Sequence, residues 1–324
     1  MKKRFKIVVT GAAGQVAYAF LFHLLSSKIF GEDVTLELRL LDLPNTLQRI
    51  HGVQMEIEDC LFSNLAKIIC TSDANEAMTD VDLAVLIGSI PRRSVTASRA
   101  DLIKDNSRIF KEQGLCLNNK ASRDVKVLVV GNPCNTNCLV ALNNAKDLSR
   151  DNFFAMTLLD ENRARSLLAH KTEVNVNAVE NVIVWGNHSS SMFPDFYHAK
   201  INDKFAHEVL SEKWLQEDFM HLVRNRGTEV IKARGVSSGA SAASGIVGTL
   251  EKIFAGSREP YSLGCCSNGQ YGVDEGLIFS FPYKNGKVVE GIAHASDFAK
   301  EQMQKTIEEL RQEREIAREI GVIR

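Results

Sequence analysis

The first half of the chain alternates short apolar runs with stretches of helical periodicity, and this alternation restricts the possible folds more than any other feature. The apolar runs are Ile7–Val9, Leu36–Leu41, Val81–Ile87 and Val125–Val130. The last two are almost entirely apolar, as expected of strands that are buried on both faces of a sheet. Strands that alternate with helices are joined by right-handed crossovers. The sequence therefore predicts an α/β fold with a doubly wound parallel sheet.

The pattern changes after about residue 150. The elements predicted there are a helix over Asp160–His170, a strand over Asn181–Trp185, a Ser/Ala/Gly-rich helix around 237–255, and turn-rich strands between Tyr261 and Val289. A charged amphipathic helix ends the chain, with Ser296 or Asp297 as its cap and with Met303, Ile307, Leu310 and Ile320 on one face. No flexible linker separates the halves. We therefore expect two closely packed domains, residues 1–152 and an α+β domain of residues 153–324.

The composition limits the partners that this chain can bind. The 39 Lys and Arg residues oppose 40 Asp and Glu residues, and a formal net charge of −1 argues against a nucleic-acid-binding surface. The seven cysteines form no CxxC pattern, which is typical of reduced thiols in the cytoplasm. The apolar run that follows the basic N-terminus is too short for a signal peptide, and no stretch reaches the length of a membrane span. We therefore expect a cytoplasmic protein that binds neither nucleic acid nor membranes.

A glycine-containing turn follows the first predicted strand and opens the first predicted helix. Such a turn needs one glycine for its geometry and another, without a Cβ, for close approach of a pyrophosphate. The helix N-terminus then offers free N–H groups and a partial positive charge to the phosphates. Two glycines alone are weak evidence, but this context predicts a dinucleotide site. Its candidate residues are Gly11, Ala12, Gly14, Gln15 and Val16.

Asp42 ends the second predicted strand, where an acidic side chain can accept hydrogen bonds from the adenosine ribose. The same carboxylate would repel a 2′-phosphate, so NAD is favoured over NADP. The alternative interpretation is that Asp42 only caps a loop. The residue by itself does not separate the two.

Three segments place polar side chains where a buried strand ends or a helix begins. Asp160 and Arg163 are three residues apart on one helical face, which is also the spacing of an ordinary surface ion pair. His188 follows a buried strand, where a structural histidine is the simpler alternative. Asn132 follows the fourth predicted strand, at the sheet edge where ligands bind in open α/β folds.

These residues stand in motifs that resemble the malate dehydrogenases of the cytosolic type and their bacterial relatives. The motifs, in family order from residue 7 to about 283, are GAAGQVAY, MEIEDC, GNPCNTNCL, LDENRAR, VIVWGNHSS, VIKARGVSS and YGVDEGLIFSFP. The resemblance implies a Rossmann-type NAD-binding domain followed by a catalytic domain that binds the substrate. It also implies a homodimer and an enzyme of the tricarboxylic acid cycle. The implied reaction is reversible hydride transfer between (S)-malate and NAD, which gives oxaloacetate and NADH.

The resemblance assigns roles that the chemistry of these side chains supports. Oxidation of a secondary alcohol requires a base for the hydroxyl proton as hydride leaves. His188 resembles the general base, and histidine is the side chain whose unperturbed pKa lies near neutral pH. Asp160 resembles its partner, which holds the ring tautomer and stabilises the imidazolium. Arg163 resembles the residue that binds the C1 carboxylate of the substrate with two N–H groups.

Three further site residues follow from the resemblance alone. Asn132 resembles the residue that binds the substrate hydroxyl or carbonyl and contacts the cofactor. Gln113 resembles another cofactor-contacting residue, and Ser241 lies where the family often lines the substrate pocket. No residue pattern predicts a metal site.

The segment Pro91–Arg99 resembles the mobile substrate loop of the family, and here the chain departs from the usual pattern. Arg92 would bind the distal carboxylate, and Arg99 the reacting carbonyl, as the loop closes and expels water. The two arginines are one residue further apart than usual, and Ser94–Ala97 replaces a stretch that usually holds a Gly-Met pair. It is therefore open whether Arg92 or Arg93 binds the distal carboxylate. Without the resemblance, a solvated basic loop would be the simpler interpretation.

Two classes of alternative function remain. The first is another NAD-dependent 2-hydroxyacid dehydrogenase, such as a lactate dehydrogenase, although a methyl group would leave the Arg92 cation unpaired in a closed site. The second is a non-catalytic dinucleotide-binding protein, including a sensor of ADP-ribose. Such a protein would need neither the Asp160–His188 pair nor Arg163 and Asn132. Fold alone does not separate these alternatives, but the site residues do.

Overall fold

The computed structural model describes residues 3–90, 99–292 and 296–324. In these ranges the main sheet has nine strands in the order β14-β13-β12-β6-β5-β4-β1-β2-β3. Its first six strands along the chain are β1 (Lys3–Thr10), β2 (Val34–Leu41), β3 (Leu65–Thr71), β4 (Leu83–Leu86), β5 (Lys126–Val129) and β6 (Phe153–Ala155). These strands are all parallel, and the order reverses between β1 and β4. The predicted doubly wound α/β fold is therefore confirmed.

The sheet continues into the second half of the chain. β6 is parallel to β5 and antiparallel to β12 (Tyr261–Cys266), and β13 (Ile278–Lys284) and β14 (Lys287–Val288) extend the antiparallel part. Five shorter strands form two small sheets: β7 (Val179–Glu180), β8 (Ile183–Trp185), β9 (Phe193–Asp195), β10 (Lys200–Ile201) and β11 (Lys204–Phe205). The predicted domain boundary, between residues 152 and 153, lies directly before β6. This strand pairs with β5 of the first predicted domain and with β12 of the second.

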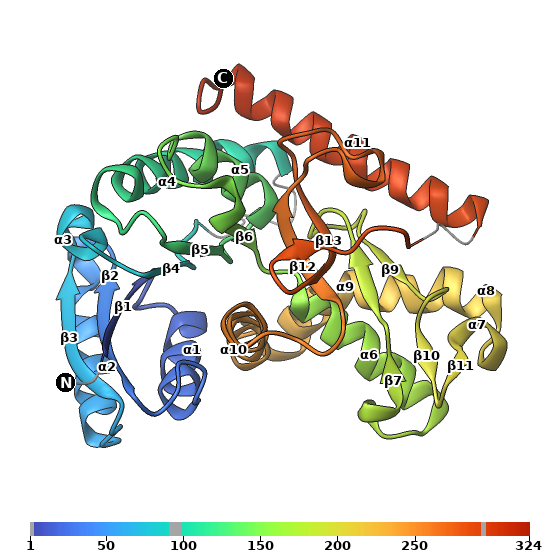
Figure 1. The fold of residues 1–324 in the computed structure, drawn as a ribbon, viewed down its shortest axis with the longest axis horizontal. Helices are drawn as coiled ribbons and strands as arrows, with labels where there is room; N and C mark the ends of the chain where they lie inside the picture. The colour runs from blue at the N-terminus through green and yellow to red at the C-terminus, as the bar shows by residue number, and fades with distance from the viewer. Residues whose placement is uncertain (1–2, 91–98, 293–295) are drawn as a thin grey trace.

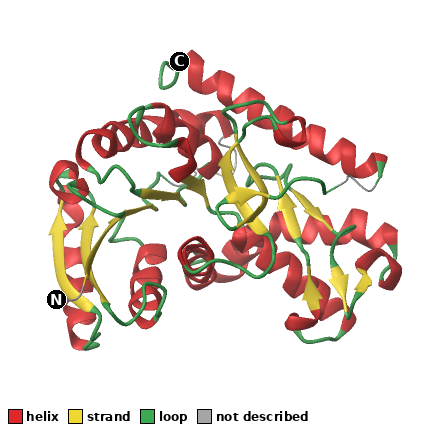
Figure 2. Cartoon of the chain, viewed as in Figure 1, coloured by secondary structure: helices red, strands yellow, loops and turns green. Residues whose placement is uncertain are grey.

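Helices lie on both sides of the main sheet (Figures 1 and 2). The helices α4 (Arg99–Lys120), α5 (Cys134–Asn143) and α11 (Asp297–Glu319) pack together along the upper side in Figure 1. On the opposite side, α1 (Gln15–Ser26) packs on α10 (Ala240–Phe254), which contacts α6 (Leu158–Thr172) and through it α9 (Met220–Arg234). The remaining helices are α2 (Leu47–Asp59), α3 (Ala74–Met78), α7 (Ala206–Val209) and α8 (Glu212–Trp214).

The apolar runs of the sequence correspond to β1, β2, β4 and β5, and the predicted helices of the second half to α6, α10 and α11. Ser296 caps α11, because its side chain accepts a hydrogen bond from the Ala299 N–H. The sequence pattern misses β3. This strand lies at the edge of the sheet, where Ala66 and Lys67 are exposed, and its apolar run is limited to Ile68–Cys70.

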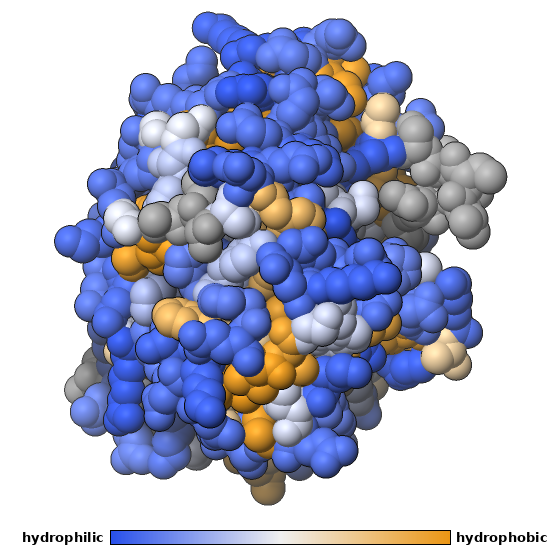
Figure 3. All heavy atoms as spheres, turned by 90° about the vertical axis from the view of Figure 1, so that its right-hand side faces the viewer, coloured by the Kyte–Doolittle hydropathy of each residue, from blue (hydrophilic) through white to orange (hydrophobic). Residues whose placement is uncertain are grey.

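The core lies on both faces of the sheet. Successive strand residues point to opposite faces, so Ile7 and Val9 join one buried cluster and Val8 the other. The face shown in Figure 3 is mostly hydrophilic, with smaller apolar areas between. Within the described ranges, no helix combines the length and apolar character needed to cross a membrane.

Candidate active site

The turns after β1 and β4 meet where the strand order reverses, the position at which open α/β sheets bind ligands. Gly11 has a φ of +65°, and a Cβ there would lie 2.5 Å from the Gly88 Cα. A Cβ on Gly88 would in turn lie 2.9 Å from the Gly11 nitrogen. Both positions therefore require glycine, and neither residue carries a side chain that would keep a pyrophosphate away from these turns.

The N-terminus of α1 fits the phosphates of a dinucleotide. Its N-cap is Gly14, which offers no side-chain hydrogen bond, and its first turn holds no acidic residue. The N–H groups of this turn are thus not used by a cap and face no negative charge within it. Ala12 is buried and Val16 is partly buried beside them. Gln15 donates from Nε2 to the carbonyl oxygen of Ser237 and, at 3.2 Å, to its hydroxyl, which ties this turn to the segment before α10.

The carboxylate of Asp42 lies at this same turn. Oδ2 accepts a hydrogen bond from the Ala13 N–H and Oδ1 one from the Leu43 N–H, both at 2.8 Å. The contact with Leu43 is the one expected if Asp42 only caps a loop. A carboxylate oxygen can accept a second hydrogen bond, so these contacts are compatible with ribose binding as well.

Asp160 is the centre of the candidate catalytic group. It lies in the first turn of α6 and is fully buried. Oδ2 is hydrogen bonded to His188 Nδ1, and Oδ1 accepts from Arg163 Nη1 at 2.8 Å. Burial by itself raises the pKa of Asp160, but the adjacent His188 and Arg163 outweigh it, and the pKa of this carboxyl lies below its ordinary value. The structure thus brings together three residues that the sequence placed in two separate segments.

His188 is held by its backbone as well as by its ring. Its N–H donates to Asn135 Oδ1 at 2.9 Å, and Asn135 Nδ2 donates to the carbonyls of Gly186 and Ile278. Gly186 has a φ of +96°, and a Cβ there would lie 2.1 Å from the Thr306 hydroxyl of α11. A side chain at this position would push α11 away from the histidine segment.

Arg99 begins α4 and is directed toward the histidine segment. Its Nε donates to the Glu313 carboxylate of α11, and its Nη2 to Asn187 Oδ1 at 3.2 Å. Arg92 and Arg93, the two candidates for the distal carboxylate, lie outside the described residues.

The other three predicted site residues lie on separate elements. Asn132 is exposed between β5 and α5, and Ser241 is exposed in the first turn of α10. Gln113 lies midway along α4, and its Oε1 atom is buried without a hydrogen-bond partner among the described residues. No hydrogen bond within the described part of the structure joins these three side chains to His188 or Asp160.

Two family models match the chain, and they divide it between them. The NAD binding domain of lactate/malate dehydrogenase matches residues 5–154, and the alpha/beta C-terminal domain of lactate/malate dehydrogenase matches residues 157–320. The chain belongs to the lactate/malate dehydrogenase family. The predicted Rossmann-type NAD-binding domain is therefore confirmed.

Proteins similar to this chain include both malate dehydrogenases and a lactate dehydrogenase. A malate dehydrogenase from Rubrobacter xylanophilus is 43% identical over 322 residues, which is 98% of each chain. The structure of a malate dehydrogenase from Naegleria fowleri superposes with a TM-score of 0.93 at 36% identity, covering 98% of both chains. A lactate dehydrogenase from Trichomonas vaginalis, in complex with NADH and oxamate, gives the same TM-score and coverage at 35% identity.

Sequence reasoning missed the buried polar residues around the Asp160–His188 pair, of which Asn135 binds the His188 backbone. Asn135, Thr136 and Asn137 begin α5 and are all fully buried, although the rest of that buried stretch is apolar. Consecutive polar residues at the start of a buried helix are a signal that the sequence does contain. The partners on α11, Thr306 and Glu313, gave no such signal, because polar residues are ordinary in a charged amphipathic helix.

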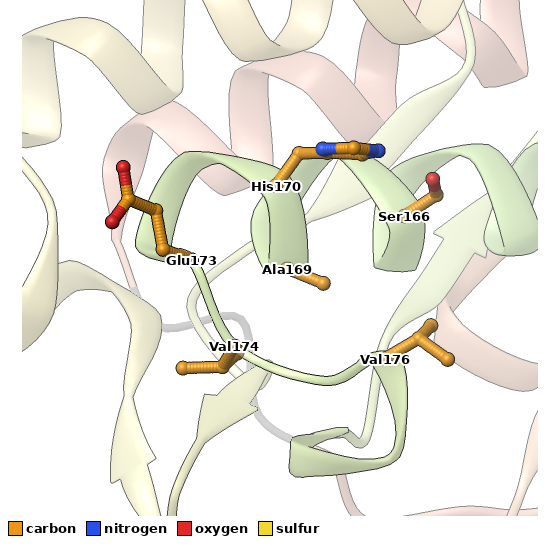
Figure 4. Close-up of a pocket in the computed structure, with 6 residues that line it drawn as sticks. All are labelled: Ser166, Ala169, His170, Glu173, Val174 and Val176. Atoms are coloured by element: carbon orange, nitrogen blue, oxygen red, sulfur yellow. The ribbon is translucent and has the colours of Figure 1, made fainter.

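A small pocket of about 250 Å³ lies elsewhere, at the C-terminal end of α6 (Figure 4). It is lined by Ser166, Ala169, His170, Glu173, Val174 and Val176. None of the predicted site residues belongs to it, so we do not assign it to the dehydrogenase site. Within the described residues, no group of three or more His, Cys, Asp or Glu side chains is placed to hold a metal ion.

Proposed function

We propose that the chain is an NAD-dependent malate dehydrogenase, which interconverts (S)-malate and oxaloacetate. The observation that carries this proposal is the buried Asp160 carboxylate, which binds a histidine and an arginine at once. A non-catalytic dinucleotide-binding protein has no need to bury such a group. The names of the Rubrobacter xylanophilus and Naegleria fowleri relatives support malate as the substrate.

The residues of this chain account for the proton and for the orientation of the substrate. When NAD is bound at the glycine turn, it would supply the acceptor or donor of the hydride. His188 takes the hydroxyl proton of malate through the ring nitrogen that does not face Asp160, and Asp160 stabilises the resulting imidazolium. Arg163 binds the C1 carboxylate. A guanidinium has five N–H donors, so the bond from Nη1 to Asp160 is compatible with a two-pronged contact to the substrate.

Several residues are proposed to complete the site. Asn132 binds the substrate hydroxyl or carbonyl and contacts the cofactor, and Ser241 lines the substrate pocket. Gln113 contacts the cofactor, as the resemblance of its segment to the family implies. Gly11, Ala12, Gly14, Gln15 and Val16 form the cradle of the pyrophosphate.

Side-by-side assays test the choice of substrate. NADH oxidation should be fastest with oxaloacetate and much slower with pyruvate and 2-oxoglutarate, because a loop arginine pairs with a distal carboxylate of the right length. The comparison uses kcat/KM for the three acids at one NADH concentration. A preference for pyruvate would replace this proposal with a lactate dehydrogenase. That alternative is kept because a lactate dehydrogenase from Trichomonas vaginalis is similar over the whole chain.

Cofactor choice gives a second expected result. NADH should be preferred to NADPH by a large ratio of kcat/KM, because a 2′-phosphate beside the Asp42 carboxylate loses a hydrogen bond and meets a like charge. Asp42→Ser should reduce this ratio, mainly by improving KM for NADPH. Comparable kcat/KM for the two cofactors in the unaltered protein would contradict the assignment of Asp42.

We also propose that the protein is a homodimer in the cytoplasm and that it acts in the tricarboxylic acid cycle. We place the boundary between its two domains at 152/153. The homodimer follows from the resemblance of the sequence motifs to the malate dehydrogenases. All seven cysteines are free, which fits a reducing compartment. A small dicarboxylate, rather than nucleic acid or a membrane, is the proposed partner. Sedimentation equilibrium tests the assembly, since a monomer mass of 35.9 kDa would contradict it.

A further inference from the structure

A buried carboxylate on the C-terminal helix joins three segments of the site. Glu313 of α11 is only 3% exposed. Its Oε1 accepts hydrogen bonds from Arg99 Nε and, at 2.8 Å, from Asn187 Nδ2, and its Oε2 accepts one from the Thr136 hydroxyl. These partners come from the start of α4, the residue before His188, and the first turn of α5.

The amphipathic pattern of α11 does not require a charge at this position. Leu310 and Ala317, close to Glu313 along the helix, are buried and apolar. Taking an ion pair out of water costs free energy, and a well-packed apolar residue in its place is often neutral or stabilising. Stability therefore gives little reason for a carboxylate here. The contact with the guanidinium of Arg99 gives a better reason for a carboxylate at this position.

Arg99 is held at two points beside the candidate catalytic histidine. Besides the contact of Nε with Glu313, its Nη2 donates to Asn187 Oδ1 at 3.2 Å. The amide nitrogen of Asn187 also binds Glu309, at 2.9 Å. Since Asn187 directly precedes His188, the contacts of Arg99 with Glu313 and Asn187 fix the guanidinium relative to the histidine segment.

We propose that Glu313 is a positioning residue that orients Arg99 toward the reacting carbonyl of the substrate. This inference rests on the proposed substrate-binding role of Arg99. A donor stabilises the transition state only if it is directed to the place where negative charge develops. A long arginine side chain loses this direction when it has no fixed partner, and a displacement of about 1 Å can cost about 10²-fold in rate.

The first test compares two carboxylates on the same helix. Glu309 lies one turn before Glu313 and accepts hydrogen bonds from Asn187, Ser189 and Ser191. Glu313→Gln should lower kcat for oxaloacetate reduction by on the order of 10²-fold, with the Kd for NADH unchanged. Glu309→Gln is the matched control and should lower kcat by less than about tenfold, because its described hydrogen bonds do not include Arg99. Equal losses of kcat in the two variants would overturn the proposal.

A double-mutant cycle separates positioning from general bracing of the fold. If Glu313 acts through Arg99, the variant with both Arg99→Gln and Glu313→Gln should stay within about threefold of Arg99→Gln alone. Effects that multiply would overturn the proposal. If Arg99→Gln keeps the kcat of the unaltered protein, the role of Arg99 in the proposed function is itself wrong. If Arg99→Gln is slow and Glu313→Gln is not, only the inference about Glu313 fails.

Chemical rescue gives a readout that a purely structural role would not change. Guanidinium chloride at a non-denaturing concentration should restore activity to Arg99→Ala, with ammonium chloride at equal ionic strength as the control. The same addition should not restore the variant that also carries Glu313→Gln. Equal rescue of both variants, or of neither, would overturn the proposal.

A milder variant covers the case in which Glu313→Gln does not fold. Thr136→Val removes the hydroxyl that holds the second oxygen of the same carboxylate. It should lower kcat by a few-fold, and this loss should disappear when Arg99 is already glutamine. A loss that persists in that background would contradict a route through Arg99.

Discussion

Replacing His188 with asparagine should lower kcat by about 10²–10⁴-fold, the usual contribution of a general acid–base residue. The affinity for NADH should stay nearly normal, because the glycine turn and Asp42 that are proposed to bind the cofactor lie on other elements. Stopped-flow and steady-state assays with oxaloacetate, together with NADH fluorescence titration, measure both quantities. A turnover close to that of the unaltered protein would show that His188 is a structural histidine.

Asp160→Asn is the companion variant. It should also lower kcat heavily, because asparagine favours the wrong ring tautomer and leaves the imidazolium unsupported. An effect confined to KM would instead indicate that Asp160 acts only by holding Arg163.

The lowered pKa of Asp160 predicts how these contacts respond to acid. A carboxyl whose pKa is lower in the folded state stabilises the protein fully above its unfolded pKa, and loses this contribution as the pH falls through the folded value. The contacts of Asp160 should therefore stabilise the fold above its ordinary pKa of 3.8, and less as the pH falls below it. Denaturant unfolding should show that the stability difference between the unaltered protein and Asp160→Asn shrinks with acid.

Arg92→Gln should lower kcat/KM for oxaloacetate by about two to nearly four decades. The substitution removes one side of an ion pair in a closed, water-poor site, which costs about 3–5 kcal/mol. Pyruvate has no distal carboxylate, so its activity should stay unchanged or rise. The preference for oxaloacetate over pyruvate should therefore collapse, and the ratio of the two kcat/KM values measures it.

Arg93→Gln is the matched control for this prediction, since it removes the same charge one residue further along the loop. It should keep the preference for oxaloacetate. The opposite pattern would show that the extra loop residue has moved Arg93 into the place of Arg92. Small and equal effects would mean that both arginines are solvated and that neither selects the substrate.

Most of the main sheet and its helices could be predicted, because these elements have recognisable local patterns of apolar residues. A strand buried on both faces must be apolar at nearly every residue, so β4 and β5 stand out, and a helix on a sheet repeats its apolar residues at helical spacing. The edge strand β3 is less distinct, because Thr71 is its one buried residue and the others are exposed or partly buried, so that charged Lys67 is tolerated within it. The motifs of the family, by contrast, are specific enough to name candidate site residues from the sequence.

By itself, the sequence determined the fold class, and it predicted the glycine turn, His188, Asp160 and Arg163 as candidate site residues. Only the tertiary structure decided how these residues are held. Asn135 reaches His188 across 53 residues of chain, and Glu313 reaches Arg99 across 214. Periodicity and spacing report on neighbours within a few turns of one element. Contacts across such separations depend on how the sheet and α11 pack together, and no local pattern records them.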